Sequence, residues 1–217
     1  HVMRAEVPGP TVGKLVSKIG RTARIMYGLY ILLTFIEVAL LLVGGMPLFD
    51  SLVNSFGTAG TGGFAIKNVS IAYYESAYVD YVIGIFMVLF GINFNLYYLI
   101  ALGNILEVLK SEELRWYIGI VVGSTALIAL DIYQIFGNVA DSIRYAFFQV
   151  SSIITTTGYA TYDFNTWPAL SQIILVLLMF CGACAGSTGG GIKVGRIIIL
   201  IKSGLREIKY MLHPRAV

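Results

Sequence analysis

Charged side chains are scarce in this sequence. Only 12% of the 217 residues are Asp, Glu, Lys or Arg, whereas 57% are hydrophobic. This balance excludes a water-soluble fold with a charged surface. Several hydrophobic runs are long enough to cross a hydrocarbon layer of ~30 Å at a rise of about 1.5 Å per residue. The composition therefore predicts a membrane protein.

Histidine and cysteine are also rare, with two residues of each. The histidines are His1 and His213, and the cysteines form the pair Cys181-Gly-Ala-Cys184. A four-ligand zinc site needs a second pair, so we interpret these cysteines as small buried residues. A membrane-embedded enzyme would need a nucleophile, a base or a metal cluster within the spans, and the hydrophobic runs offer none. We expect neither enzyme activity nor a cofactor.

Basic residues gather at one end of each hydrophobic run. The opposite ends hold only Lys67 and Arg144. By the positive-inside rule, this chain is a multi-pass protein of the plasma membrane with both ends and the central linker in the cytoplasm. This distribution also accounts for the net charge of +3, so nucleic acid is not an expected partner. The basic residues assigned to the cytoplasmic side are Arg4, Lys14, Lys18, Arg21, Arg24, Lys110, Arg115, Lys202, Arg206, Lys209 and Arg215.

The hydrophobic runs divide into two modules with the same order of segments. Each module predicts a span, a short helix opened by a turn, a glycine- and threonine-rich segment and a second span. The predicted fold is thus an all-α membrane protein that resembles a potassium channel, with four transmembrane helices and two re-entrant half-helices. The predicted spans are 25–43, 82–106, 116–136 and 170–201, and the half-helices are 48–57 and 141–153.

Five regions follow from this division. They are a cytoplasmic interfacial segment (1–24), a first pore module (25–109), a charged linker (110–115), a second pore module (116–204) and a cytoplasmic tail (205–217). The opening residues, His1-Val-Met-Arg4, contain neither an initiator Met nor an apolar signal region. We therefore expect this chain to be an internal or processed part of a longer one.

The two glycine- and threonine-rich segments repeat each other. Thr61-Gly-Gly-Phe64 aligns with Thr156-Thr-Gly-Tyr159 at an offset of 95 positions. Non-helical backbone at membrane depth survives only where protein surrounds it or where it lines a watery cavity. Two copies in two modules favour a pore lining, in which carbonyl oxygens replace the water around a cation.

Each residue type in these segments suits that chemistry. Glycine permits unusual backbone dihedrals, and the short helices point their partly negative carboxyl ends at the cavity. The threonine hydroxyls either face the ion or hydrogen-bond the wall, and the two aromatic side chains are expected to brace it. The predicted filter residues are Thr61, Gly62, Gly63, Phe64, Thr156, Thr157, Gly158 and Tyr159.

A glycine-rich run from Cys181 to Gly191 interrupts the last span. A phosphate loop would require Gly-Lys-Ser/Thr after a strand, but here Ile192 follows Gly191. A flexible constriction that gates the pathway is the better interpretation. Lys193 either repels cations or, as we favour, anchors the helix end by extending to the interface. The predicted gate residues are Gly182, Gly186, Ser187, Thr188, Gly189, Gly190, Gly191 and Lys193.

Two acidic residues, Glu37 and Asp131, fall inside the first span of each module. An acid at membrane depth needs a partner or water. Candidate partners are Asn93, Asn95 and the backbone of the filter. A hydrogen-bonded brace behind the filter is favoured over direct contact with an ion.

Together with Asp163-Phe164, Trp167-Pro168 and Gly186-Ser-Thr-Gly-Gly-Gly-Ile-Lys193, these motifs resemble the Trk/Ktr/HKT superfamily of potassium uptake proteins over essentially the whole chain. The resemblance implies four modules around one pore, of which this chain matches the second and third. It places filter glycines at Gly63 and Gly158, K⁺ as the transported ion, and the glycine-rich run as a gate beneath the filter. It also implies that further modules or a second copy complete the pore in a homodimer, docked on a cytoplasmic nucleotide-binding subunit.

The leading functional hypothesis is selective, passive K⁺ permeation. Na⁺-coupled K⁺ symport is the alternative within transport, although glycine in both filter segments favours selectivity for K⁺. A non-conducting scaffold, the alternative from another class, leaves the repeated segments unexplained.

Overall fold

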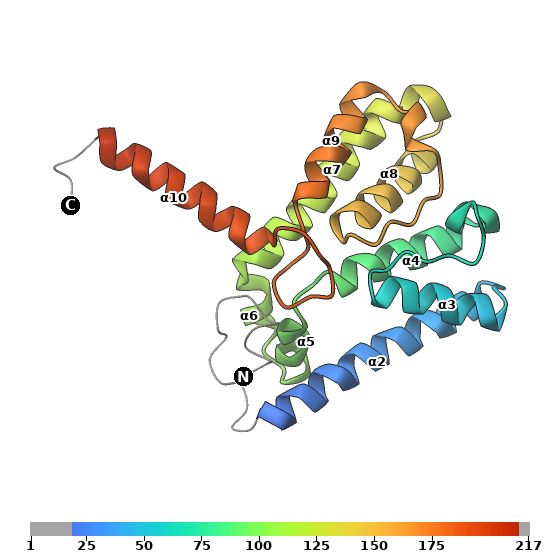
Figure 1. The fold of residues 1–217 in the computed structure, drawn as a ribbon, viewed down its shortest axis with the longest axis horizontal. Coiled ribbons are helices and arrows are strands. Elements are labelled where there is room, and N and C mark those ends of the chain that lie inside the picture. The colour runs from blue at the N-terminus through green and yellow to red at the C-terminus, as the bar shows by residue number, and fades with distance from the viewer. Residues whose placement is uncertain (1–18, 213–217) are drawn as a thin grey trace.

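The computed structural model describes residues 19–212, and this part of the chain is almost entirely helical (Figure 1). Its only β-type pairing is an isolated bridge between Cys181 and Ile192. The all-α prediction is confirmed. Most of the predicted interfacial segment, residues 1–18, and the end of the tail, residues 213–217, lie outside the described residues.

The first module begins with the long helix α2, Ile19–Val43, and turns at Gly44–Met46. Pro47 then precedes α3, because its missing amide costs nothing at a helix start. The helix α3, Leu48–Ala59, is too short to span a membrane and packs against α2. A 3₁₀ turn, η1 (Ser70–Tyr74), and the helix α4 (Ala77–Phe90) follow.

Polar contacts tie η1 to the start of α3. The Tyr74 hydroxyl donates to Asp50 Oδ2 at 2.7 Å, and the Asn54 side-chain amide donates to the same hydroxyl at 3.3 Å. Burial, followed by the neighbouring Asp50 carboxylate, raises the pKa of Tyr74 to about 12. The hydroxyl therefore keeps its proton and the contact to Asp50 at every physiological pH.

The predicted single span 82–106 is wrong, because the chain bends there by 92°. The helix α4 ends at Phe90, and α5, Phe94–Ala101, starts anew with Asn93 as its N-cap, whose Oδ1 accepts from Asn95 N at 2.9 Å. A side chain at Gly91 would overlap the Tyr117 hydroxyl. A short helix, α6 (Ile105–Lys110), completes the module.

The second module repeats the first. Only Ser111 separates α6 from α7, Glu112–Phe136, so most of the predicted linker 110–115 is helical. The short helix α8, Val139–Ile154, packs between α7 and α4. A 3₁₀ turn, η2 (Phe164–Thr166), leads to α9, Ala169–Phe180, and the last helix, α10 (Val194–Leu212), projects away from the rest of the molecule (Figure 1).

Two helices of the described residues are long and apolar enough to cross a membrane: α2, through Ala23–Val43, and α7. The bent pair α4 and α5 counts as a third span if taken together, and the apolar α9 is shorter. Phe35 on α2 and Leu130 on α7 are 66% and 76% exposed. Large apolar side chains on an outer face are expected where a helix faces lipid.

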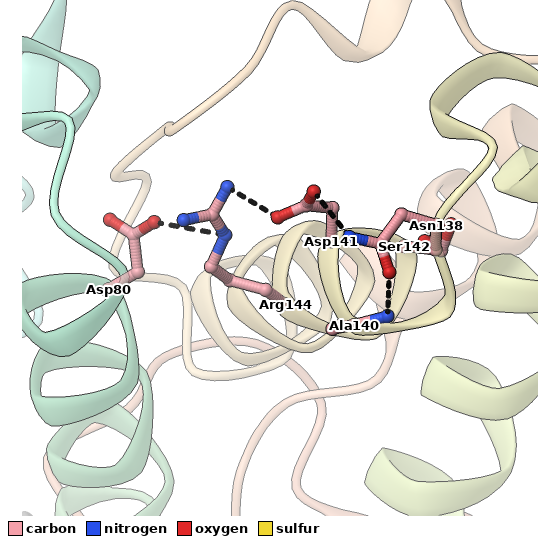
Figure 2. A network of polar contacts seen from close by, with 6 residues as sticks. All are labelled: Asp80, Asn138, Ala140, Asp141, Ser142 and Arg144. Carbon is pink, nitrogen blue, oxygen red and sulfur yellow. Dashed lines mark hydrogen bonds and ion pairs between the residues drawn. The ribbon is translucent and has the colours of Figure 1, made fainter.

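An ion-pair network joins the two modules (Figure 2). Arg144 on α8 lies between Asp141, at 2.9 Å, and Asp80 on α4, at 3.7 Å. Asn138 caps the start of α8, since its Oδ1 accepts from Ala140 N at 3.0 Å while its Nδ2 donates to Asp141 Oδ2 at 3.1 Å. The network fixes the start of α8 against α4 of the first module.

Candidate functional site

The two repeated segments, Thr61–Phe64 and Thr156–Tyr159, are called here the first and second Thr-Gly segments. They follow α3 and α8 directly, and they share an unusual backbone. Thr61 and Thr156 have φ of 50° and 60°, and Gly63 and Gly158 have φ of 64° and 89°. A β-branched residue at positive φ is rare. Thr61 and Thr156, which lie 95 positions apart, both have this positive φ, so the sequence repeat is also a conformational repeat.

Hydrogen bonds turn the amides of both segments back toward the preceding helix. Gly62 N and Gly63 N donate to Gly57 O at 2.8 and 3.4 Å. Thr157 N and Gly158 N donate to Ser152 O at 2.9 and 3.3 Å, again 95 positions later. Within residues 19–212, no donor reaches the backbone carbonyl oxygens of Thr61, Gly62, Gly63, Thr156, Thr157 or Gly158.

In both Thr-Gly segments the backbone amides are hydrogen-bonded and the carbonyl oxygens are not, so the oxygens form a surface of hydrogen-bond acceptors. Such oxygens need a partner when water is excluded. A cation that has lost its hydration shell supplies one. The arrangement therefore has the chemistry of a cation site built from backbone oxygens.

The two segments touch through their backbones. A side chain on Gly63 would overlap the carbonyl oxygen of Thr157, whereas nothing described lies within 4 Å of one on Gly158. Tyr159 is fully buried, and its hydroxyl donates to Asn54 O at 3.0 Å and to Phe64 O at 3.4 Å. Tyr159 thus links the second segment to the first module.

Phe64 behaves differently from Tyr159, its counterpart in the repeat. It is 80% exposed, so it braces nothing within the described chain. The expectation that both aromatic residues brace the segments therefore fits only Tyr159 in this structure. The Tyr159 ring therefore fills the contact between the two modules, whereas Phe64, at the equivalent position of the first module, lies on the surface of the described chain.

The threonine hydroxyls contact the glycine-rich loop, residues 182–191. Thr61 Oγ1 donates to Thr188 O at 3.1 Å, and Thr156 Oγ1 accepts from Gly190 N at 2.7 Å. The Thr157 hydroxyl pairs with that of Thr155 at 2.8 Å. Of the two roles considered for these hydroxyls, the structure displays hydrogen bonds to the wall and the loop.

The glycine-rich loop is also fastened to the bend between α4 and α5. Cys184 N donates to Gly91 O at 3.0 Å, and Phe94 N donates to Gly186 O at 3.1 Å. The loop closes on itself where Gly182 N donates to Ile192 O at 2.6 Å. The loop thereby supplies a donor for the Gly91 carbonyl after α4 and an acceptor for the first amide of α5, and both bonds stabilise the bend.

Several other predicted loop residues have defined contacts. The Lys193 ammonium donates to the carbonyl oxygen of Gly189, inside the loop. Ser187 Oγ donates to Cys184 O at 2.6 Å. Gly191 has φ of 72° and packs on Gly182. Both cysteines are free thiols.

Glu113, in the first turn of α7, was missed by the sequence analysis. Its Oε1 accepts from Ala185 N at 2.8 Å and from Gly195 N at 3.1 Å. One carboxylate oxygen therefore joins the glycine-rich loop to the first turn of α10. Nothing in the sequence spacing pairs Glu113 with residues 72 and 82 positions away, and it was counted among the charges of a linker.

The two intramembrane acids have different surroundings. Asp131 Oδ2 accepts from Ser171 N at 3.0 Å and from Ser171 Oγ at 2.6 Å. Glu37 is fully buried, and neither of its oxygens has a hydrogen-bond partner among the described residues. Neither acid pairs with the expected asparagines.

Comparisons with known proteins identify the family and the fold of this chain. Residues 3–217 match the family described as "TrkH: Cation transport protein". The chain is 38% identical to the Trk system potassium uptake protein TrkH of Salmonella typhimurium and 33% identical to that of Halomonas elongata, with 100% and 99% of this chain and 46% and 45% of those proteins covered. The crystal structure of the potassium transporter TrkH from Vibrio parahaemolyticus matches all of this chain and 47% of its own, with a TM-score of 0.89 and 33% identity.

The chain thus spans about half the length of the relatives that it matches. The matching region includes both modules, both Thr-Gly segments and the glycine-rich loop. The family consists of transporters and not of enzymes. This chain belongs to the TrkH family of cation transport proteins.

Proposed function

We propose that this chain forms half of a potassium-selective pore whose filter is the pair of Thr-Gly segments. The observation that carries the proposal is the repeated backbone, with matched positive φ angles, bound amides and free carbonyls at positions 95 residues apart. A structural brace would not require six carbonyl oxygens without donors. A filter does, because these oxygens replace the hydration shell of the ion.

The choice of K⁺ draws on the relatives, which are named as potassium uptake proteins. Glycine at both Gly63 and Gly158 agrees with selectivity for K⁺ over Na⁺. Na⁺-coupled K⁺ symport remains the alternative mechanism. It predicts that K⁺ flux requires a Na⁺ gradient, whereas passive permeation does not.

The open edges support a pore completed by other modules. Tyr159 of the second module packs into the first, so repetition requires that Phe64 pack into a module preceding the first. By the same repetition, a following module would occupy the open space beside Gly158. We infer that further modules of a longer polypeptide or a second copy supply these surfaces in a multi-pass plasma-membrane protein, which acts as a homodimer with a cytoplasmic nucleotide-binding subunit.

The glycine-rich loop is proposed as the gate. It hydrogen-bonds Thr61 and Thr156, the first residue of each Thr-Gly segment, and therefore lies against the same end of both. The loop leads directly into α10, which projects from the bundle. A cytoplasmic partner that moves α10 would pull on the loop and shift it between two arrangements.

A glycine series tests the filter. Gly63→Ala and Gly158→Ala each add backbone strain at positive φ, and Gly63→Ala also overlaps Thr157 O, whereas Gly119→Ala, on α7 with open space around it in this chain, adds neither. The strain alone costs about 1–3 kcal/mol. We expect ⁸⁶Rb⁺ uptake by the assembled transporter in liposomes to lose selectivity over Na⁺ in Gly63→Ala and in Gly158→Ala, with Gly119→Ala unchanged. Equal selectivity in all three variants would refute the filter.

A further inference from the structure

Arg144 joins the second short helix to the first module, and the proposed function does not use it. Its guanidinium lies 3.7 Å from Asp80 Oδ2 on α4 and 2.9 Å from Asp141 Oδ1 on its own helix, α8 (Figure 2). The pair with Asp141 lies within one helix, so only the pair with Asp80 crosses between the modules. Within residues 19–212 it is the one ion pair that joins the first module to the second.

The charge of Arg144 breaks the sequence repeat. At the offset of 95 positions, Arg144 corresponds to Phe49 on α3, and Asp141 corresponds to Met46. Where the second short helix has a guanidinium, the first therefore has an aromatic ring, which is 67% exposed. A charge required by the shape of the module itself would recur in both copies. The guanidinium thus belongs to the junction between these two modules.

Stability alone does not account for this ion pair. The side chains of Asp80 and Arg144 are 8% and 16% exposed, so both charges have lost most of their water. The cost of removing that water offsets much of their attraction, and apolar residues of similar volume often stabilise as well or better. The contacts beside the pair are of the apolar kind, since Tyr81 stacks on Phe147 with ring centroids 6.3 Å apart and Phe147 also covers Gly84.

The ion pair adds a constraint that the apolar contacts lack. Apolar attraction is not directional, so the stack of Tyr81 on Phe147 tolerates a small shift of one helix along the other. A pair of buried charges does not tolerate such a shift, because a charge that leaves its partner stays buried and uncompensated. Among the described residues, Arg144 is the only basic side chain that pairs with Asp80. The pair therefore selects one position of α8 along α4.

The position of α8 determines the position of the second Thr-Gly segment. Ser152, in the last turn of α8, accepts from Thr157 N and Gly158 N and donates from Oγ to Tyr159 O at 2.6 Å. Continuous helix connects Arg144 to Ser152, so a shift at one end is transmitted to the other. The first segment follows α3, which packs on α2 and α4. A shift of α8 along α4 therefore changes the distances between the free carbonyls of the two segments.

We propose that Arg144 is a positioning residue for ion selectivity. Its pair with Asp80 holds the second Thr-Gly segment at the distance from the first that suits K⁺. The inference rests on the proposed filter, and it assigns a part in selectivity to a side chain that lies outside both segments.

Transport by the assembled transporter in liposomes tests this role. Arg144→Met keeps an unbranched side chain beside the Tyr145 ring but leaves Asp80 without its partner. A misplacement of about 1 Å can cost about a hundredfold at a site that depends on geometry, and here only one of the two segments shifts, so we expect selectivity for ⁸⁶Rb⁺ over Na⁺ to fall about tenfold. Arg144→Lys, which keeps the charge, should lose less.

Asp141→Asn is the matched control. It removes the more exposed partner of Arg144, which lies within α8, and leaves the pair between the modules intact, so selectivity should equal that of the parent. The ratio of ⁸⁶Rb⁺ to Na⁺ uptake does not depend on how much transporter inserts. A loss of folded protein alone would therefore leave this ratio unchanged in Arg144→Met.

A double-mutant cycle supplies a readout that does not require conduction. The Tm of the purified transporter should fall in Asp80→Asn and in Arg144→Met, and the double variant should fall by less than the sum of the two, because both changes break the same pair. Additive changes would contradict the pair itself. Coupling in Tm with the selectivity of the parent retained in Arg144→Met would overturn the positioning role. A parent that does not distinguish ⁸⁶Rb⁺ from Na⁺ would contradict the proposed filter, and this inference with it.

Discussion

Glu113 offers a way to test whether the glycine-rich loop holds the pathway closed. Its Oε1 accepts from Ala185 N in the loop and from Gly195 N in the first turn of α10, at 2.8 and 3.1 Å. Glu113→Ala removes both bonds. The Glu113 carboxylate is half-buried. We therefore assign a stabilisation of about 1–1.5 kcal/mol to each of its two hydrogen bonds, which is at or below the lower end of the stabilisation found for hydrogen bonds to charged groups.

The two bonds together contribute about 2–3 kcal/mol to the arrangement seen here, which corresponds to a change of about 30- to 150-fold in the ratio of closed to open loop. We expect the basal ⁸⁶Rb⁺ flux of Glu113→Ala, measured in liposomes without a cytoplasmic partner, to rise toward that factor. Glu113→Gln keeps the acceptor oxygen and loses only the charge, so its flux should rise less.

Glu112 provides the matched control at the next position. It pairs with Lys202 on α10 at 2.6 Å, but both side chains are exposed to solvent. Water and salt screen such a pair. Glu112→Ala should therefore leave the basal flux unchanged. A Glu113→Ala protein that inserts normally and conducts no more than Glu112→Ala would refute a loop held by Glu113.

Two further predictions concern the loop and the orientation of the chain. Deletion of residues 187–190 removes the contacts of Thr188 and Gly190 with the Thr-Gly segments, so basal K⁺ flux should rise and depend less on the cytoplasmic partner. Selectivity should survive, because the amide bonds to Gly57 and Ser152 remain. A regulated flux equal to that of the parent would contradict the gate and assign the glycines to close helix packing. Cysteines introduced near Asn68 or Asp163 should react with an impermeant reagent added outside intact cells, whereas those near Lys110 and Lys209 should react only after the membrane is opened. The reverse pattern would contradict the cytoplasmic placement of both ends.

The sequence determined the features that depend on local chemistry. Proline before α3, the length of each apolar run and the glycine content of residues 182–191 act within a few residues of themselves. They were sufficient to predict the helical class, the short helices after each first span and the interrupted last span. The Thr-Gly repeat was visible for the same reason, since similar local sequences after equivalent short helices adopt the same backbone.

Only the tertiary structure decided which of these local features meet. The bend after Phe90 was not predicted, although Gly91 and Asn93 interrupt the apolar run there, because it is stabilised by Cys184 and Gly186, more than 90 residues later. Tyr159 and Phe64 read as equivalents, yet one is buried against a neighbouring module and the other has no neighbour in this chain. Glu37 and Asp131 are likewise indistinguishable in sequence, and only the placement of the Ser171 hydroxyl and amide beside Asp131 satisfies one and leaves the other without a donor. Hydrogen bonds act over about 3 Å of space whatever the separation along the chain. The partners of these side chains could therefore be assigned only from the tertiary structure.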